Sequence, residues 1–293
     1  MSAVLHVVVA ATDVDVAIDV LWSHGAVGVH TADVVDGVRL VTAFADDVDP
    51  TTVGHEMAAR LPAAEVTVVD DDGTWWDAWR THAVPTSVAG GRLVIVPAWQ
   101  EPPPLAPGTV VVRIEPGRTF GSGAHATTRL ALATLVDLEP ELAGARVLDV
   151  GCGSGVLAVV AARLGAAHVM GVDVDPACAS ATEANAAANG LAGRVRATTG
   201  PLAELAGPFD VVVANVLPPV LEALAPEIDR LGRRWLVVTG MLTETTVDGT
   251  ERALRAFPSW HLAERSSEDG WSAALLRRDR FLTGANEELR GTR

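Results

Sequence analysis

The chain has 293 residues, enough for two domains, with 49% hydrophobic and 20% charged residues, which excludes a disordered protein. No apolar run approaches the ~20 residues that a membrane-spanning helix needs. The first residues lack basic side chains and reach Asp13 too early for a signal peptide. Cys152 and Cys178 are too few for a disulfide framework or a cysteine-rich zinc site. We therefore expect a cytoplasmic protein with no membrane association and no metal.

The net charge of −15 bears on possible partners. An acidic surface repels phosphate, whereas proteins that bind nucleic acids usually carry a basic face. The sequence contains no lysine, so every basic side chain apart from histidine is arginine. The charge favours a basic partner or a small molecule over direct binding of nucleic acid. Acidity that only keeps the protein in solution explains it equally well.

The first 72 residues have the pattern strand, helix, strand, strand, helix, strand, which is typical of a ferredoxin-like domain. The expected elements are residues 5–10, 14–25, 26–33, 38–44, 52–61 and 64–70. An acidic run at 70–72 ends this domain. A helix is predicted over 74–83, where three tryptophans are spaced to bury one face. We assign residues 73–91 to a linker that contains this helix.

Residues 92–278 are predicted to form a Rossmann-like domain, followed by a polar tail over 279–293. Two strands, at 92–99 and 109–116, flank a loop whose prolines prevent regular structure. From residue 126 helices and apolar strands alternate, which predicts a mainly parallel sheet covered on both faces. The expected strands are 146–150, 168–174, 194–199, 209–215, 234–240, 260–265 and 271–277, and the expected helices are 126–138, 155–164, 177–189, 218–231 and 243–256. Such sheets bind ligands at the carboxyl ends of their strands.

A glycine loop follows the strand at 146–150. Gly151, Gly153 and Gly155 alternate there, which lets the backbone turn sharply and approach a ligand. A glycine triplet alone is equally compatible with an ordinary tight turn. Here, however, Asp173 ends the next strand 22 positions after Gly151, close to the ~20-residue spacing at which a carboxylate binds ribose hydroxyls. Together the loop and the acid predict a nucleotide site.

Two residues of the loop discriminate between nucleotides. A dinucleotide site requires G-x-G-x-x-G, but Val156 stands where the last glycine would fall. Asp149 places a carboxylate at the mouth of the loop, where it would repel a pyrophosphate but suit the ammonium of a methionine group. An acid followed by G-x-G-x-G resembles the first motif of class I methyltransferases. A nicotinamide dehydrogenase is the weaker interpretation.

A second glycine-rich stretch, EPGRTFGSGAHATT, covers residues 115–128. Phe120 and Gly121 are typical of a lid that folds over a cofactor, with Phe120 as an apolar anchor. The hydroxyls of Thr127 and Thr128 are placed to cap the helix that follows. A flexible linker with an ordinary cap would explain the threonines but not the phenylalanine. We assign no proton-transfer role to His125.

Asn215 ends the strand at 209–215. Its side chain could cap the next helix, and this alternative is as good as a functional one. In the functional interpretation the amide faces the reactive methyl group. Its carbonyl then accepts an N–H from an amine nucleophile and orients the lone pair. Asn215 is therefore our candidate catalytic residue.

Together these stretches resemble the PrmA-type family of methyltransferases, which modify the large-subunit ribosomal protein L11. The resemblance rests mainly on EPGRTFGSGAHATT, VLDVGCGSGVLAVVAARLGA, GVDVDPACASATEANAAANG and FDVVVANVL. The family's lid usually reads F-G-T-G-T-H-P-T-T, so Ser122, Ala124 and Ala126 are departures. Losing the proline at position 126 could loosen the lid or shift the helix start.

The resemblance implies S-adenosylmethionine as cofactor, contacted by Thr128, Gly151, Asp173 and Asn215. It also implies methylation of lysine and N-terminal amines of the ribosomal protein, held by the N-terminal domain, and we expect a monomer. Another protein, a small molecule or RNA remains an alternative substrate, and a non-enzymatic module that only binds nucleotide remains an alternative function. The absence of N-P-P-[YF] after the fourth strand of the Rossmann-like domain argues against methylation of glutamine amides or base amines.

Overall fold

The computed structural model describes residues 3–24, 26–35, 37–44, 48–70, 83–116, 119, 121–242 and 254–278. The helix predicted at 74–83, most of the helix predicted at 243–256 and the tail from 279 lie outside the described residues. The chain divides into two compact units. Unit 1 comprises Met1–Ala83 and Arg118–Phe120, and unit 2 comprises Val84–Gly117 and Gly121–Arg293.

Unit 1 contains one four-stranded sheet and two helices. Its elements are β1 (Ala3–Val9), α1 (Val14–Ser23), β2 (Ala26–Val34), β3 (Gly37–Phe44), α2 (Pro50–Arg60) and β4 (Glu65–Asp70). The strand order is β2-β3-β1-β4 and all neighbours are antiparallel. Alternate residues of β1, Leu5 and Val7, are buried with Leu21 and Met57 of the helices. The order of elements along the chain is the one predicted.

The main sheet of unit 2 has seven strands in the order β10-β9-β8-β11-β12-β14-β13. The five strands from β10 to β12 run parallel, and β14 and β13 are antiparallel to their neighbours. The prediction of a mainly parallel sheet is confirmed. The strands are β8 (Arg146–Val150), β9 (His168–Val172), β10 (Val195–Thr198), β11 (Phe209–Asn215), β12 (Gly232–Leu242), β13 (Trp260–Glu268) and β14 (Trp271–Arg278).

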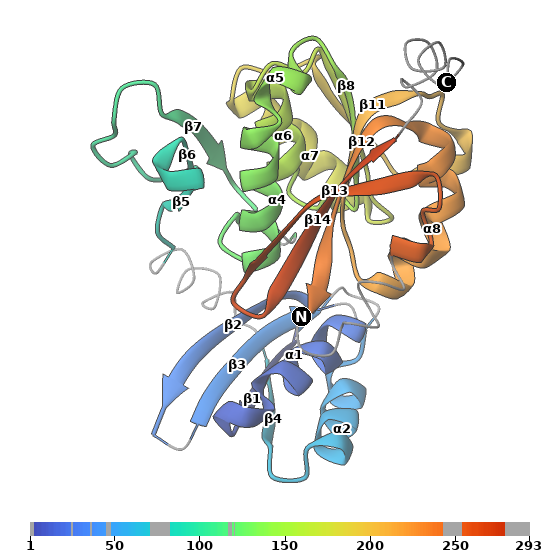
Figure 1. Ribbon diagram of the computed structural model, residues 1–293. Coiled ribbons are helices and arrows are strands. Elements are labelled where there is room, and N and C mark those ends of the chain that lie inside the picture. The colour runs from blue at the N-terminus through green and yellow to red at the C-terminus, as the bar shows by residue number, and fades with distance from the viewer. Residues whose placement is uncertain are drawn as a thin grey trace, which may run out of the picture. The chain divides into compact units, whose positions relative to one another are not determined.

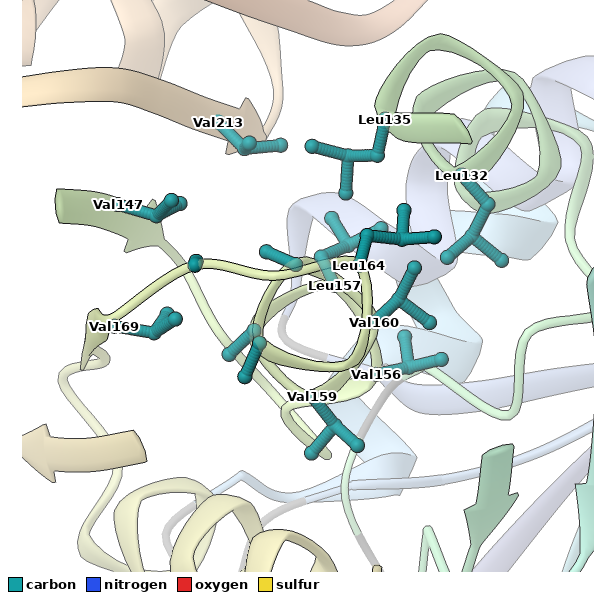
Figure 2. Packing of buried hydrophobic residues seen from close by; sticks show 14 of the residues in the cluster. Leu132, Leu135, Val147, Val156, Leu157, Val159, Val160, Leu164, Val169 and Val213 are labelled. Carbon is teal, nitrogen blue, oxygen red and sulfur yellow. The ribbon is translucent and has the colours of Figure 1, made fainter. Parts of the chain in front are cut away.

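Helices cover both faces of this sheet, with α4 and α6 on one side and α8 on the other (Figure 1). Successive residues of β11 alternate between two cores, Val213 belonging to one and Val212 to the other. Because both faces are buried, the strand is apolar throughout. Figure 2 shows the first core, where Leu157 and Val160 pack between the sheet and α4. The helices are α4 (Ala126–Asp137), α6 (Val156–Arg163), α7 (Pro176–Ala188) and α8 (Pro218–Leu231).

Two local features differ from the sequence-based expectation. Part of the range assigned to the linker, Thr86–Val88, forms strand β5, which pairs with β6 (Leu93–Pro97). With β7 (Val110–Ile114) these strands make a separate three-stranded sheet rather than joining the main one. The apolar runs at 92–99 and 109–116 predicted β6 and β7 but not the sheet to which they belong. A short helix, α5 (Glu139–Leu142), was also not predicted.

The last two strands are added to the sheet out of sequence order. β14 lies between β12 and β13, and within the described residues β13 pairs only with β14. The turn between them, Asp269 and Gly270, contacts α4, because Asp269 accepts a hydrogen bond from Arg129.

No helix in the described part of the chain is long and apolar enough to cross a membrane.

Candidate active site

The site lies where the strand order reverses, at the carboxyl ends of β8 and β11. From β8 the sheet continues through β9 and β10 on one side and through β11 and β12 on the other. Open α/β sheets bind ligands at such a point. The loops that leave the two strands are in contact, because a Cβ on Gly151 would lie 2.7 Å from Cγ1 of Val216. The structure thus brings the predicted glycine loop beside Asn215.

The glycine loop requires its glycines. Gly151, Gly153 and Gly155 have φ values of +72°, +53° and +79°, in the left-handed region that side chains disfavour. A Cβ on Gly155 would also lie 2.7 Å from the side chain of Thr182 in α7. The loop therefore combines the sharp turn that the alternating glycines predicted with close packing against α7, which was not predicted.

Asp173 is held by the glycine loop itself. Its Oδ2 accepts a hydrogen bond of 3.0 Å from the backbone N–H of Gly153, and its Oδ1 accepts one of 3.1 Å from that of Asp175. Each carboxylate oxygen can accept a further hydrogen bond. The half-exposed carboxylate is therefore oriented by backbone groups and retains acceptor capacity for a pair of hydroxyls.

Asp149 was expected at the mouth of the loop, but its side chain is buried, with 1% of the residue exposed. Its Oδ2 accepts a hydrogen bond of 3.0 Å from the N–H of Ala158 in the first turn of α6. It thereby caps a helix whose N-cap residue, Gly155, has no side chain. Among the described residues Oδ1 has no hydrogen-bond partner. Burial raises the pKa of this carboxyl to about 7. The hydrogen bond from Ala158 acts in the opposite direction and lowers the pKa, and the negative charge of Asp173 raises it by a smaller amount.

Asn215 and Thr128 are brought together from distant parts of the chain. Nδ2 of Asn215 donates to Oγ1 of Thr128 at 3.4 Å. The capping alternative for Asn215 is wrong, because α8 begins at Pro218 with Leu217 as its N-cap and no side chain caps it in this described stretch. The amide therefore belongs to the site at the end of β11.

The helix α4 begins where predicted, but its capping residue differs from the prediction. The N-cap is His125 rather than a threonine, and its Nδ1 accepts from the N–H of Thr127 at 3.4 Å. Nδ1 also lies 2.8 Å from Oγ1 of Thr127. Burial, aided by Arg129, lowers the pKa of His125 to about 4, so the ring is neutral at physiological pH. α4 still begins at Ala126, where the family usually has proline.

The turn between β13 and β14 holds this helix start in place. Arg129 donates from Nε to Glu268 at 3.1 Å and from Nη2 to Asp269 at 2.6 Å. Its Nη1 donates to the carbonyl oxygen of Ala124. The arginine thus joins the loop before α4 to the C-terminal hairpin. Of the predicted lid residues, Gly121 is described and Phe120 lies outside the described residues.

Sequence reasoning missed Ser154 and Asn185, which are buried beside the glycine loop. Ser154 lies within the loop and Asn185 lies on α7, and they are joined by a hydrogen bond of 2.9 Å from Nδ2 of Asn185 to the Ser154 carbonyl. A signal was present, since Asn185 and Asn189 are spaced four residues apart on an otherwise alanine-rich helix. That spacing places both amides on one helix face.

The sheet order and the glycine loop followed by Asp173 define a class I S-adenosylmethionine-dependent methyltransferase. The family model described as ribosomal protein L11 methyltransferase (PrmA) matches residues 4–279. The chain belongs to this family, and the predicted resemblance is confirmed. The cofactor is accordingly S-adenosylmethionine, as predicted.

Individual relatives agree with the family match. The ribosomal protein L11 methyltransferase of Pelobacter propionicus is 42% identical over 223 residues, covering 74% of this chain and 71% of the relative. That of Syntrophotalea carbinolica is 34% identical over 268 residues, covering 82% and 87%. The crystal structure of a ribosomal protein L11 methylase from Lactobacillus delbrueckii subsp. bulgaricus has a TM-score of 0.58 at 30% identity. It covers 64% of this chain and 95% of that one.

Proposed function

We propose that this enzyme transfers methyl groups from S-adenosylmethionine to amines of the large-subunit ribosomal protein L11. The observation that carries the proposal is the extent of the family match, which runs from residue 4 to residue 279. It therefore includes unit 1 as well as the sheet that forms the methyltransferase fold. A methyltransferase with another target would be expected to share only the second part.

The cofactor fits the residues present at the carboxyl ends of β8 and β9. Asp173 would accept hydrogen bonds from the ribose hydroxyls, since its orientation is already set by backbone donors. Gly151 and Gly153 would let the backbone approach the methionine group. Oδ1 of Asp149, a buried acceptor without a partner among the described residues, would accept from the cofactor's ammonium. We also assign Gly155, Gly121 and Thr128 to this site. Phe120, which lies outside the described residues, stays a predicted cofactor contact from the sequence alone.

The cofactor supplies a methyl group already activated on a sulfonium, so the enzyme mainly has to align the nucleophile. A lysine amine with a pKa of about 10.4 must first lose its proton, at a cost of about 4–5 kcal/mol at pH 7. Burial beside a cationic sulfonium lowers that pKa and reduces the cost. With Nδ2 of Asn215 bonded to Thr128, Oδ1 of the amide is the atom that would accept an N–H from the neutral amine.

Unit 1 is the part that we assign to substrate recognition, because every residue assigned to the cofactor other than Phe120 lies in unit 2. The net charge of −15 favours a basic protein substrate and disfavours direct binding of nucleic acid. A ribosomal protein substrate would place the reaction in the cytoplasm. We infer a monomer, with one acceptor amine presented at a time.

The test is methyl transfer from labelled S-adenosylmethionine to three separate acceptors: purified ribosomal protein L11, ribosomal RNA and a metabolite extract. Mass spectrometry of the protein product then identifies the modified amines. We expect label in L11 only, on lysine or N-terminal amines. Label in RNA or in a metabolite, with none in L11, would overturn the substrate assignment. Binding of cofactor without formation of S-adenosylhomocysteine on any acceptor would favour a non-enzymatic module.

A further inference from the structure

Asn185 of α7 and Asn189, the C-cap residue of this helix, bind the backbone at the end of β7. Oδ1 of Asn189 accepts from the N–H of Arg113 at 2.9 Å, and its Nδ2 donates to the carbonyl of Arg113 at 2.7 Å. Asn185 makes the same pair of bonds to Glu115, each at 2.9 Å. The two amides thus bind alternate residues through both backbone groups, in the way a neighbouring strand does. They fix the chain where it leaves the small sheet.

Asn185 makes one contact that Asn189 does not. Its Nδ2 also donates to the backbone carbonyl of Ser154 in the glycine loop at 2.9 Å. Both hydrogens of the amide are therefore used, one on Glu115 and one on Ser154. Asn185 and Ser154 are buried, so the loss of the bond between them would leave the Ser154 carbonyl without this donor away from water.

Ser154 also binds the far end of the same stretch of chain. Its Oγ donates to the carbonyl of Gly121 at 2.6 Å and accepts from the N–H of Val156 at 3.3 Å. Gly121 has φ +105°, and a Cβ there would lie 2.8 Å from the serine Oγ. Only glycine permits this approach. Glu115 and Gly121, on either side of residues 116–120, are thus both attached to the glycine loop, Gly121 directly by Ser154 and Glu115 through Asn185.

We propose that Ser154 and Asn185 are positioning residues of the methyltransferase. They attach the chain on both sides of residues 116–120 to the glycine loop and so set the shape of the cofactor site. The proposal rests on the assignment of the glycine loop to S-adenosylmethionine. Ser154 immediately precedes Gly155 in the glycine loop. Its side chain donates to Gly121, and its backbone carbonyl accepts from Asn185. A change at either residue therefore disturbs cofactor binding and not only stability.

Asn189 provides a matched control for this role. Asn189→Ala removes two hydrogen bonds to Arg113, together with a bond to the backbone carbonyl of Asn185. Asn185→Ala likewise removes two hydrogen bonds to Glu115. Asn189→Ala leaves the contact between Asn185 and Ser154 intact. Each variant is measured as the full-length protein, for its melting temperature without cofactor and for its dissociation constant for S-adenosylmethionine by calorimetry. We expect Ser154→Ala and Asn185→Ala to weaken cofactor binding at least tenfold. Asn189→Ala should lower the melting temperature while changing the dissociation constant less than threefold.

Two results would overturn the proposal. If Asn185→Ala and Asn189→Ala weaken cofactor binding by the same factor, Asn185 only stabilises the fold. Unchanged binding in Ser154→Ala would show that the attachment of Gly121 does not shape the site. Should Asn185→Ala fail to fold, Ser154→Ala against Asn189→Ala decides the matter alone. Asp173→Ala is measured in parallel, because normal binding of S-adenosylmethionine by that variant would refute the cofactor assignment itself. None of these measurements uses a methyl acceptor, so they do not depend on the identity of the substrate.

Discussion

The side chains of Asn215 and Thr128 meet at 3.4 Å, with Nδ2 of the amide donating to Oγ1 of the hydroxyl. This contact joins the end of β11 to the first turn of α4. Thr128 is buried, with 1% of the residue exposed, so the hydroxyl is a fixed partner for the amide. Because the pairing occupies Nδ2, Oδ1 is the end of the amide that our proposal assigns to the substrate amine.

The first prediction follows from this pairing. Asn215→Ala should lower kcat by roughly 10²-fold, because the amine loses the acceptor that aligns it, while cofactor affinity changes little. Thr128→Val, which keeps the size of the side chain but removes the hydroxyl, should lower kcat by a smaller factor. Steady-state kinetics with L11 and calorimetry with S-adenosylmethionine measure the two effects. An Asn215→Ala enzyme with unchanged kcat would remove Asn215 from the catalytic machinery.

The second prediction separates two neighbouring carboxylates. Asp173→Ala should lose most of the rise in melting temperature that S-adenosylmethionine causes, because the ribose hydroxyls lose their charged acceptor. Asp175 caps α7 by accepting from the N–H of Ala177 at 2.8 Å, and it serves as the control. Asp175→Ala should cost about 1 kcal/mol of stability but preserve the cofactor-induced rise. NAD should raise the melting temperature of neither variant nor of the unmodified enzyme.

The third prediction concerns pH. The pKa of Asp149 is raised from its ordinary value of 3.8 to about 7, so its protonation favours the folded state. The resulting stability is present below about pH 4 and is lost as the pH rises through 7. Asp149→Asn has no such proton to lose. Relative to the unmodified enzyme, it should gain stability between pH 5 and pH 8, by at most about 4 kcal/mol.

Urea unfolding without cofactor at the two pH values measures this difference. A difference in the free energy of unfolding that does not change with pH would mean that Asp149 is ionised throughout. Cofactor binding supplies a second readout, because a cationic ligand favours the ionised carboxylate. The affinity for S-adenosylmethionine should therefore rise with pH in the unmodified enzyme more than in Asp149→Asn.

The fourth prediction tests the packing of the glycine loop. Gly155→Ala should destabilise the protein by more than 2 kcal/mol by rough estimate, because the new Cβ meets Thr182 as well as an unfavourable φ. Gly190 has a similar φ of +71°, but nothing lies within 4 Å of its would-be Cβ. Gly190→Ala should cost only the backbone strain, roughly 1 kcal/mol. Equal losses in the two variants, measured by chemical unfolding, would show that contact with α7 does not matter.

The fifth prediction concerns the division of labour between the units. A protein that lacks residues 1–72 should keep S-adenosylmethionine binding but lose methylation of folded L11, because selecting one amine requires a second surface. Calorimetry provides the control for folding, and methyl incorporation into intact L11 provides the readout. A shortened enzyme that methylates L11 as fast as the full chain would show that unit 1 does not recognise the substrate.

Much of the site could be predicted because its signals are local in sequence. The bounds of β11 and α8 agree with the prediction residue for residue, since an apolar strand followed by paired prolines has sharp limits. Gly151 and Asp173 follow a spacing imposed by one β-α-β unit. The hydrogen bond from the N–H of Gly153 to Asp173 lies within this same unit and involves no distant residue.

The remaining features depend on contacts between distant residues. The bond from Ser154 to Gly121 spans 33 positions, and that from Asn185 to Glu115 spans 70. Neither residue type signals a partner, because a serine among glycines and an asparagine in a helix usually face solvent. His125 was not predicted as an N-cap because histidine has no strong preference there, and its burial against Trp271 depends on the C-terminal hairpin.

The position of β14 between β12 and β13 has a consequence for biosynthesis. As the chain emerges from the ribosome, β13 appears first, but β14, the strand with which it pairs in the described structure, is made only afterwards. The carboxylates that hold Arg129 lie at the turn between these strands, so the start of α4 reaches its final attachments only then. Thr128 immediately precedes Arg129. The contact of Thr128 with Asn215 therefore gains its full support only after translation has passed β14.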